Sequence, residues 1–160
     1  MLRLAGAALI FAASLAAGLC AAGMYRTRVI QLEAFHSLIV HIGRQIDSCL
    51  VPLDRIYAAY RDPVLERCGF LAELRRSGGE AALSACGYRL LLSDTEIHEL
   101  TAFFMGLGRH SAEEEPRHCA YFSARIGELA EKARGELAAK TRLCRAFGML
   151  LGIMLAVILL

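Results

Sequence analysis

The sequence predicts an all-α protein, in which a cytoplasmic bundle of about six helices is flanked by an N-terminal and a C-terminal transmembrane helix. Ala, Leu, Glu and Arg dominate the chain, and no stretch shows the sustained apolar–polar alternation of a β-strand. In the middle of the chain, apolar residues recur every three or four positions, as they do along one face of a helix. Both ends are apolar and uncharged, which explains a mean hydropathy of +0.44 over 160 residues.

The two apolar ends predict membrane spans. Residues 4–25 carry no charge, and 22 residues of helix are long enough to cross a hydrocarbon core of about 30 Å. Residues 146–160 form a shorter uncharged run, about 22 Å as helix, which Arg142 and Arg145 precede and from which they can snorkel to the interface. We therefore expect transmembrane helices at 1–25 and 146–160 and a cytoplasmic helical domain at 26–145.

Charge distribution predicts the orientation. All 16 acidic and 17 of the 18 basic residues lie between the two apolar ends, and basic residues stand at both edges of this middle segment. The positive-inside rule then places the middle domain in the cytoplasm and both termini outside. The alternative is a cleaved signal peptide, with Arg3, the apolar run and Ala16-Ala17-Gly18 as its parts, releasing an extracytoplasmic, disulfide-stapled helical domain. Arg26 and Arg28, directly after the run, favour the membrane span.

The six cysteines fit the cytoplasmic interpretation. They stand at positions 20, 49, 68, 86, 119 and 144, and no Cys-x-x-Cys pair occurs among them. A zinc knuckle or a thioredoxin-like site would need such a pair. Two of the six lie in or beside the expected spans, and we expect the other four, Cys49, Cys68, Cys86 and Cys119, to be reduced and to pack as small buried apolar residues.

The first helices of the middle domain are bounded by proline and glycine. A helix is expected over 26–48, continuous with the first span because no helix breaker separates them. Pro52 begins a short second helix, and Pro63 begins a third, since proline suits the first helical position. Ser77-Gly78-Gly79 ends the third helix.

The later helices are bounded by capping signals. A fourth helix is expected over 81–92. Ser93 with Glu96 forms a capping box that opens a fifth, and Gly106-Leu107-Gly108 ends it. Ser111 with Glu114 is a second capping box, from which a long helix runs into the second span.

Composition and motifs argue against several functions. A formal net charge of +2 does not favour a nucleic-acid binder. Gly106-x-Gly108 lacks the third glycine and the preceding strand of a dinucleotide-binding loop. His118 and Cys119 are adjacent in a helix and point about 100° apart, so they do not form a nucleophile–base pair, and with His110 they lack the spacing of metal ligands. We expect no catalytic residues, no metal and no cofactor, and thus a protein that is not an enzyme.

Two charged groups and one glycine pair are candidate contact residues. Glu113, Glu114 and Glu115 at a helix start, and Arg75-Arg76 at a helix end, fit either solvated helix termini or contacts with a protein partner. Gly148 and Gly152 are four residues apart in the second span, a spacing that lets transmembrane helices pack closely, for example with the Ala- and Gly-rich first span.

Three stretches of the chain resemble the stage III sporulation protein AB family of endospore-forming bacteria. The start, Met-Leu-Arg-Leu-Ala-Gly-Ala, is similar to the family's Met-Leu-(Lys/Arg)-Leu-x-Gly-Ala. Ile46 with Pro52-Leu53 resembles the family's Glu-Ile followed by Thr-Pro-Leu. The end, Arg-x-x-Arg-x-x-Gly-x-x-x-Gly with a closing Ile-Leu-Leu, resembles the family's Lys-x-x-Lys-x-x-Gly-x-x-x-Gly and its Ile-Leu-Leu. The chain departs from the family at Gln45, Val51, Ser111 and Glu115, where the family has Glu, Thr, Asp and Gln.

The resemblance implies a platform protein. The family's soluble domain is similar to the cytoplasmic domain of the inner-membrane platform protein of type II secretion and type IV pilus systems, a helical bundle. The implied partner is a secretion-type ATPase, stage III sporulation protein AA, together with other components of the channel between mother cell and forespore. The bundle would lie in the mother-cell cytoplasm, with or without self-association into a homo-oligomer.

Overall fold

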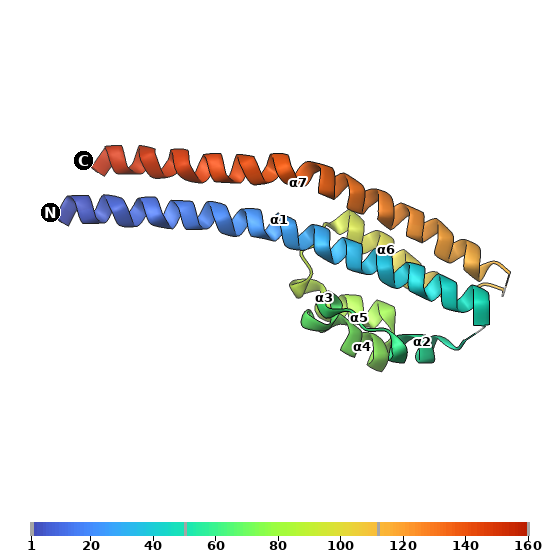
Figure 1. The fold of residues 1–160 in the computed structure, drawn as a ribbon. Helices are drawn as coiled ribbons and strands as arrows, with labels where there is room; N and C mark the ends of the chain where they lie inside the picture. The colour runs from blue at the N-terminus through green and yellow to red at the C-terminus, as the bar shows by residue number, and fades with distance from the viewer. Residues whose placement is uncertain (1, 50, 112, 160) are drawn as a thin grey trace. The chain divides into compact units, whose positions relative to one another are not determined.

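The computed structural model describes the backbone of residues 2–49, 51–111 and 113–159; side chains of these ranges are described except at 2–11, 14, 15, 48, 49, 145, 148, 151–153 and 155–159. Its helices (Figure 1), in chain order, are α1 (Leu2–Cys49), α2 (Leu53–Ala59), α3 (Pro63–Arg67), α4 (Phe70–Ser77), α5 (Gly79–Cys86), the 3-10 helix η1 (Gly87–Arg89), α6 (Asp94–Gly106) and α7 (Glu115–Leu159). No strand occurs over the described backbone, which confirms the all-α fold class.

The chain divides into two compact units. Unit 1 comprises Met1–Thr27 and Ala133–Leu160, and unit 2 comprises Arg28–Lys132. Helices α1 and α7 contribute to both units. The predicted domain limits at residues 25 and 145 mark the expected ends of the transmembrane helices. The division into two units does not test them.

Unit 1 exposes large apolar side chains. The exposed ones are Leu19, Met24, Leu143, Phe147, Met149, Leu150 and Met154. The Tyr25 ring faces Lys140, with 5.4 Å between the ammonium nitrogen and the ring centroid. A search of the described residues finds no helix with an apolar stretch long enough to cross a membrane. More than half of the residues in the predicted spans have side chains outside the described set, so the flanking transmembrane helices stay a prediction.

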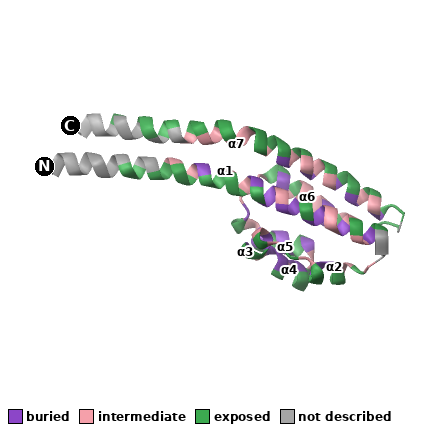
Figure 2. Cartoon of the chain, in the orientation of Figure 1, coloured by how far each residue is buried: buried purple, intermediate pink, exposed green. Residues whose placement is uncertain are grey.

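Unit 2 has an aromatic core. Phe35 of α1 packs edge-on against Phe70 of α4, with ring centroids 4.8 Å apart, and Phe70 also meets Phe104 of α6 at 5.9 Å. Figure 2 shows buried positions along α1 and α6 and within the group formed by α2–α5. The apolar face predicted for the first helix is confirmed as buried, and its residues are Leu32, Phe35, Leu38, Ile39, Ile42 and Ile46.

Two buried polar side chains connect α1 to other elements of unit 2. Glu96, which is 2% exposed, accepts hydrogen bonds from the guanidinium of Arg28 at 2.6, 3.1 and 3.2 Å. Gln31, which is 4% exposed, accepts from the Leu91 amide at 2.8 Å and donates to the Arg89 carbonyl at 3.3 Å. These contacts hold the segment between α5 and α6 against α1.

The predicted starts at Pro63 and Ser93 are confirmed, and the start predicted at Pro52 falls one residue later, at Leu53. Pro52 is the N-cap of α2. Ser93 is the N-cap of α6, and its amide donates to Glu96 Oε2 at 2.7 Å, the reciprocal bond of a capping box. Gly106-Leu107-Gly108 ends α6 as predicted, with Gly108 in the left-handed region at φ +80°.

Two predicted helices are shorter than expected. The helix expected from Pro63 to Ser77 is interrupted at Gly69, which adopts φ +82° and separates α3 from α4. The helix expected over 81–92 begins at Gly79 and ends at Cys86. After η1 the backbone is extended at Leu90, because Gln31 supplies partners for the flanking Arg89 carbonyl and Leu91 amide.

Candidate functional site

A groove lies at one end of unit 2, where the last turn of α1, the start of α2 and the α6–α7 loop meet. Its volume is about 310 Å³. It is lined by Ile46, Val51, Pro52, Leu53, Gly108, His110 and Glu115. We call it the loop-end groove. Its floor is mainly apolar, and the exposed Glu113 and Glu114 belong to the same loop.

Glu115, the first residue of α7, holds the α6–α7 loop in place. Its side chain is buried, and its carboxylate accepts hydrogen bonds from the Gly108 amide at 2.8 Å and the His110 amide at 3.3 Å. Nδ1 of His110 lies 3.6 Å from the same carboxylate. A carboxylate here also faces the helix N-terminus, which favours negative charge. Glu115 therefore shapes the wall of the loop-end groove.

His118 locks α6 to α7 on the other side of this loop. Its Nε2 lies 3.1 Å from the Phe103 carbonyl oxygen, and its ring stacks on Phe103 with 5.6 Å between centroids. The His110 ring is 4.6 Å away. A Cβ at Gly106 would come within 2.9 Å of His118 Nε2, so the absence of a side chain at Gly106 permits this contact.

The Cys119 side chain packs against α1, whereas the adjacent His118 side chain packs against α6. The Cys119 Cβ lies 3.0 Å from where a Cβ at Gly43 would stand, so α1 and α7 pack closely here. Burial, and secondarily the negative charge of Glu115, raises the pKa of the Cys119 thiol to about 11. The thiol is thus protonated at neutral pH, which does not suit a nucleophile. Cys20, Cys68, Cys86 and Cys144 are likewise free thiols.

The raised pKa of Cys119 predicts a loss of stability at high pH. An unfolded thiol ionises near pH 9 and the folded one near pH 11, so between these values the unfolded chain binds fewer protons and folding weakens. We expect the free energy of unfolding to fall by up to about 2 kcal/mol more in the native chain than in a Cys119→Ala variant. Urea unfolding of both chains in detergent at pH 8, 9, 10 and 11 measures this. Parallel curves for the two chains would contradict the prediction, since all other titrating groups are shared.

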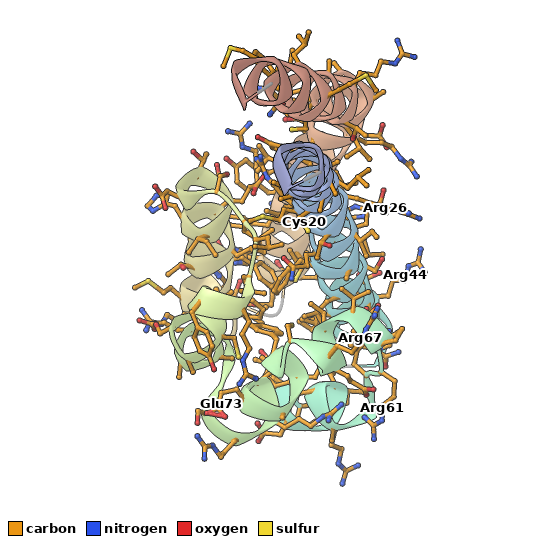
Figure 3. All side chains as sticks on the ribbon, turned by 90° about the vertical axis from the view of Figure 1, so that its left-hand side faces the viewer. Cys20, Arg26, Arg44, Arg61, Arg67 and Glu73 are labelled. Atoms are coloured by element: carbon orange, nitrogen blue, oxygen red, sulfur yellow. The ribbon has the colours of Figure 1, made fainter. Side chains whose placement is uncertain are left out.

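The two predicted arginines are engaged within the group formed by α2–α5. Arg75 donates to the carbonyls of Tyr57 at 3.1 Å and Tyr60 at 2.8 Å, and so caps the C-terminal end of α2. Arg76 forms an ion pair with Glu73 on the same helix. In Figure 3, Glu73 lies on one side of this group, and Arg61 lies on the other. Both arginines are exposed and both have partners within this group, Arg75 across to α2 and Arg76 along its own helix.

The three predicted glutamates do not act as one surface run. Glu113 and Glu114 are exposed, but Glu115 is buried. The expected second capping box forms only in part, since Glu114 Oε2 lies 3.5 Å from the Ser111 amide and α7 begins at Glu115. The surface that this segment offers to a partner consists of Glu113 and Glu114.

Two further predictions concern packing and metal binding. The side chains of Gly148 and Gly152 lie outside the described residues, so their predicted packing is not addressed. Among the side chains that are described, no three His, Cys, Asp or Glu residues lie close enough together to hold a metal ion.

The arrangement around the loop-end groove offers an apolar floor with charged neighbours, which is the chemistry of protein docking.

Sequence reasoning missed the apolar part of the site. Ile46, Val51 and Leu53 come from both sides of the break at Pro52, and only the fold brings them to Gly108. A Cβ at Gly108 would lie 3.2 Å from Cδ1 of Leu53, so the loop approaches α2 closely. The sequence feature that could have indicated the apolar floor is the group of apolar residues on both sides of Pro52, namely Ile46, Val51 and Leu53.

Comparisons with known proteins place the chain in a family. The family model for stage III sporulation protein AB matches residues 3–160. Neither the comparison with curated proteins nor that with solved structures gave a match. Because the family match covers essentially the whole chain, this protein belongs to the stage III sporulation protein AB family, and its role is in sporulation.

Proposed function

We propose that the protein is a non-catalytic platform, anchored in the mother-cell membrane by its two apolar ends, that docks a secretion-type ATPase similar to stage III sporulation protein AA. In this role it would serve the channel between mother cell and forespore, together with other channel components. The observation that carries the proposal is the loop-end groove, with its apolar floor and the exposed acidic pair Glu113 and Glu114 beside it.

Exposed apolar surface supports the anchoring. Leu143, Phe147 and Leu150 are each more than half exposed in unit 1, and a soluble surface rarely carries so many large apolar side chains together. Tyr25 and Lys140 form an aromatic–basic pair of the kind found at membrane interfaces. Lipid would cover these side chains in an anchored chain.

The position of the groove along the chain supports the docking. Ile46 lines the groove and is 18 residues beyond Arg28, where unit 2 begins. This length of α1 corresponds to about 27 Å of helix. The groove therefore lies within unit 2, apart in sequence from the apolar ends.

The chemistry of the surrounding residues supports a non-catalytic role. The Glu115 carboxylate accepts bonds from two loop amides, His118 Nε2 lies at hydrogen-bonding distance from a backbone carbonyl, and the Cys119 thiol is buried. Each of these groups has a structural role within unit 2. Glu115 does line the loop-end groove, but its carboxylate is engaged there by the Gly108 and His110 amides rather than by a nucleophile.

Charge reversal beside the groove tests the docking. We expect the double variant Glu113→Arg/Glu114→Arg to bind the ATPase about tenfold or more weakly, because like charges would then face the basic residues of the partner. The measurement is a binding titration of the purified ATPase with the full chain in lipid vesicles. Leu53→Ala, which removes part of the apolar floor, is expected to weaken binding in the same assay.

A matched control uses Glu80→Arg/Glu128→Arg. Both residues are exposed, on α5 and α7, and neither lines the groove. This double variant changes the net charge by the same amount. Equal losses in both double variants would point to a long-range charge effect, and unchanged binding in Glu113→Arg/Glu114→Arg would reject this docking site.

A further inference from the structure

Tyr88 is an unusually exposed aromatic residue. It lies on η1, its side chain is 77% exposed, and it is the most exposed of the large apolar side chains in the described chain. The guanidinium of Arg89 sits over its ring, 5.0 Å from the centroid. Exposed tyrosine with an arginine beside it is an amphipathic pair, apolar in its body and charged or polar at its tips.

The pair is held firmly to α1. Gln31 bonds the Arg89 carbonyl and the Leu91 amide, and Gln31 itself is buried. Arg89 Nη1 also lies 3.1 Å from where a Cβ at Gly69 would stand, so the arginine packs over a glycine that has no side chain. The exposure of Tyr88 therefore belongs to an ordered turn with two anchoring points.

The anchoring residue is close in sequence to the expected membrane surface. Gln31 comes six residues after Tyr25, and six residues of α1 rise about 9 Å. The headgroup region of one leaflet is about 5–8 Å thick. If the first span ends at Tyr25, the α1 backbone that holds this turn is next to the headgroup region.

We propose that Tyr88 and Arg89 contact the phospholipid headgroup layer, with the tyrosine ring in the interface and the arginine on anionic phosphate. Tyrosine is enriched at membrane interfaces, and basic side chains are drawn to anionic leaflets. The contact would give unit 2 a second attachment to the membrane besides the two chain ends. The proposal rests on the membrane anchoring in the proposed function, and it is independent of ATPase docking.

The chain contains no tryptophan, so one introduced tryptophan is a clean probe. The full chain carrying Tyr88→Trp is reconstituted in vesicles that contain phosphatidylglycerol and lipids with brominated acyl chains, which quench tryptophan at the interface. The matched control is Tyr121→Trp, since Tyr121 is 63% exposed but lies near the start of α7. We expect strong quenching in the Tyr88→Trp chain and little in the Tyr121→Trp chain.

Arg89→Glu, placed in the Tyr88→Trp chain, tests the phosphate contact. We expect it to reduce the quenching in anionic vesicles and to change it less in vesicles of phosphatidylcholine alone. Flotation of the same vesicles shows separately whether the chain is anchored. A chain that floats with the vesicles while its Tyr88→Trp fluorescence is quenched no more than the control overturns this proposal and leaves the anchoring intact. A chain that does not float overturns the anchoring, and the headgroup contact with it.

Discussion

Replacing Glu96 by alanine is expected to lower the free energy of unfolding of unit 2 by about 3–5 kcal/mol, because it breaks a buried ion pair from one side. Glu96 is 2% exposed, and its nearest contact to Arg28 is 2.6 Å. The substitution takes the buried carboxylate away from a guanidinium that is itself three-quarters buried. It also removes the acceptor for the Ser93 amide at the start of α6. Urea unfolding of the full chain in detergent, followed by circular dichroism, measures the loss.

A double-mutant cycle separates the pair from its surroundings. Arg28→Ala and the double variant Arg28→Ala/Glu96→Ala complete the cycle, and we expect the double variant to be less destabilised than the sum of the two single ones. The matched control is Glu99→Ala, one turn along α6, whose pair with Arg125 is less buried, with side chains 19% and 41% exposed. We expect a smaller effect there, since water reaches this pair more readily than the Arg28–Glu96 pair and screens it more. Equal losses for Glu96→Ala and Glu99→Ala would show that burial of the pair contributes little.

The long helices and their capping could be predicted from the sequence because these are local properties. The apolar face of α1 between Leu32 and Ile46 follows from its spacing, and the start of α6 follows from Ser93 and Glu96. The conformation at each of these positions depends mainly on residues within one or two helical turns. Such features can therefore be predicted without knowledge of the rest of the fold.

The interruptions of helices could not be predicted in the same way. Gly69 stands in an apolar helical pattern, where glycine is tolerated; it adopts φ +82°, and Arg89 Nη1 lies 3.1 Å from where its Cβ would stand. The extended backbone at Leu90, inside the helix expected over 81–92, lies between two bonds to Gln31, which is 58 residues away from Arg89. Long-range partners of this kind leave no periodic signal near the residue they affect.

Only part of the candidate site could be predicted, because the rest depends on contacts between residues far apart in the sequence. Glu113, Glu114 and Glu115 are identical in the sequence, and only the course of the α6–α7 loop decides which carboxylate is buried against the Gly108 amide. The apolar floor comes from Ile46 and Leu53, on separate helices. Charged runs are visible in a sequence, but a groove is a property of packing.

Replacing Gly79 by alanine is the second substitution with a large expected effect. A Cβ at Gly79 would overlap the ring of Phe104, with Cε1 at 2.7 Å and two further ring atoms closer. The ring has little room to move, because it packs against Phe103 at 5.0 Å and Phe70 at 5.9 Å. We expect a loss of about 1–3 kcal/mol from overpacking, which outweighs the gain of up to about 1 kcal/mol that alanine brings as a better helix former. The free energy of unfolding in urea measures the balance.

Gly87, just beyond the other end of α5, provides the matched control for this substitution. It has helical backbone angles, φ −50° and ψ −38°, and a Cβ there would meet no atom within 4 Å. Gly87→Ala is therefore expected to leave stability unchanged or to raise it by about 0.4–1 kcal/mol, since it restricts only the unfolded chain. Trimming the ring in Gly79→Ala/Phe104→Leu is expected to recover part of the loss, because the added methyl group then has room. If Gly79→Ala and Gly87→Ala shift stability alike, then α5 and α6 do not pack through this glycine, and the contact between them must be made elsewhere.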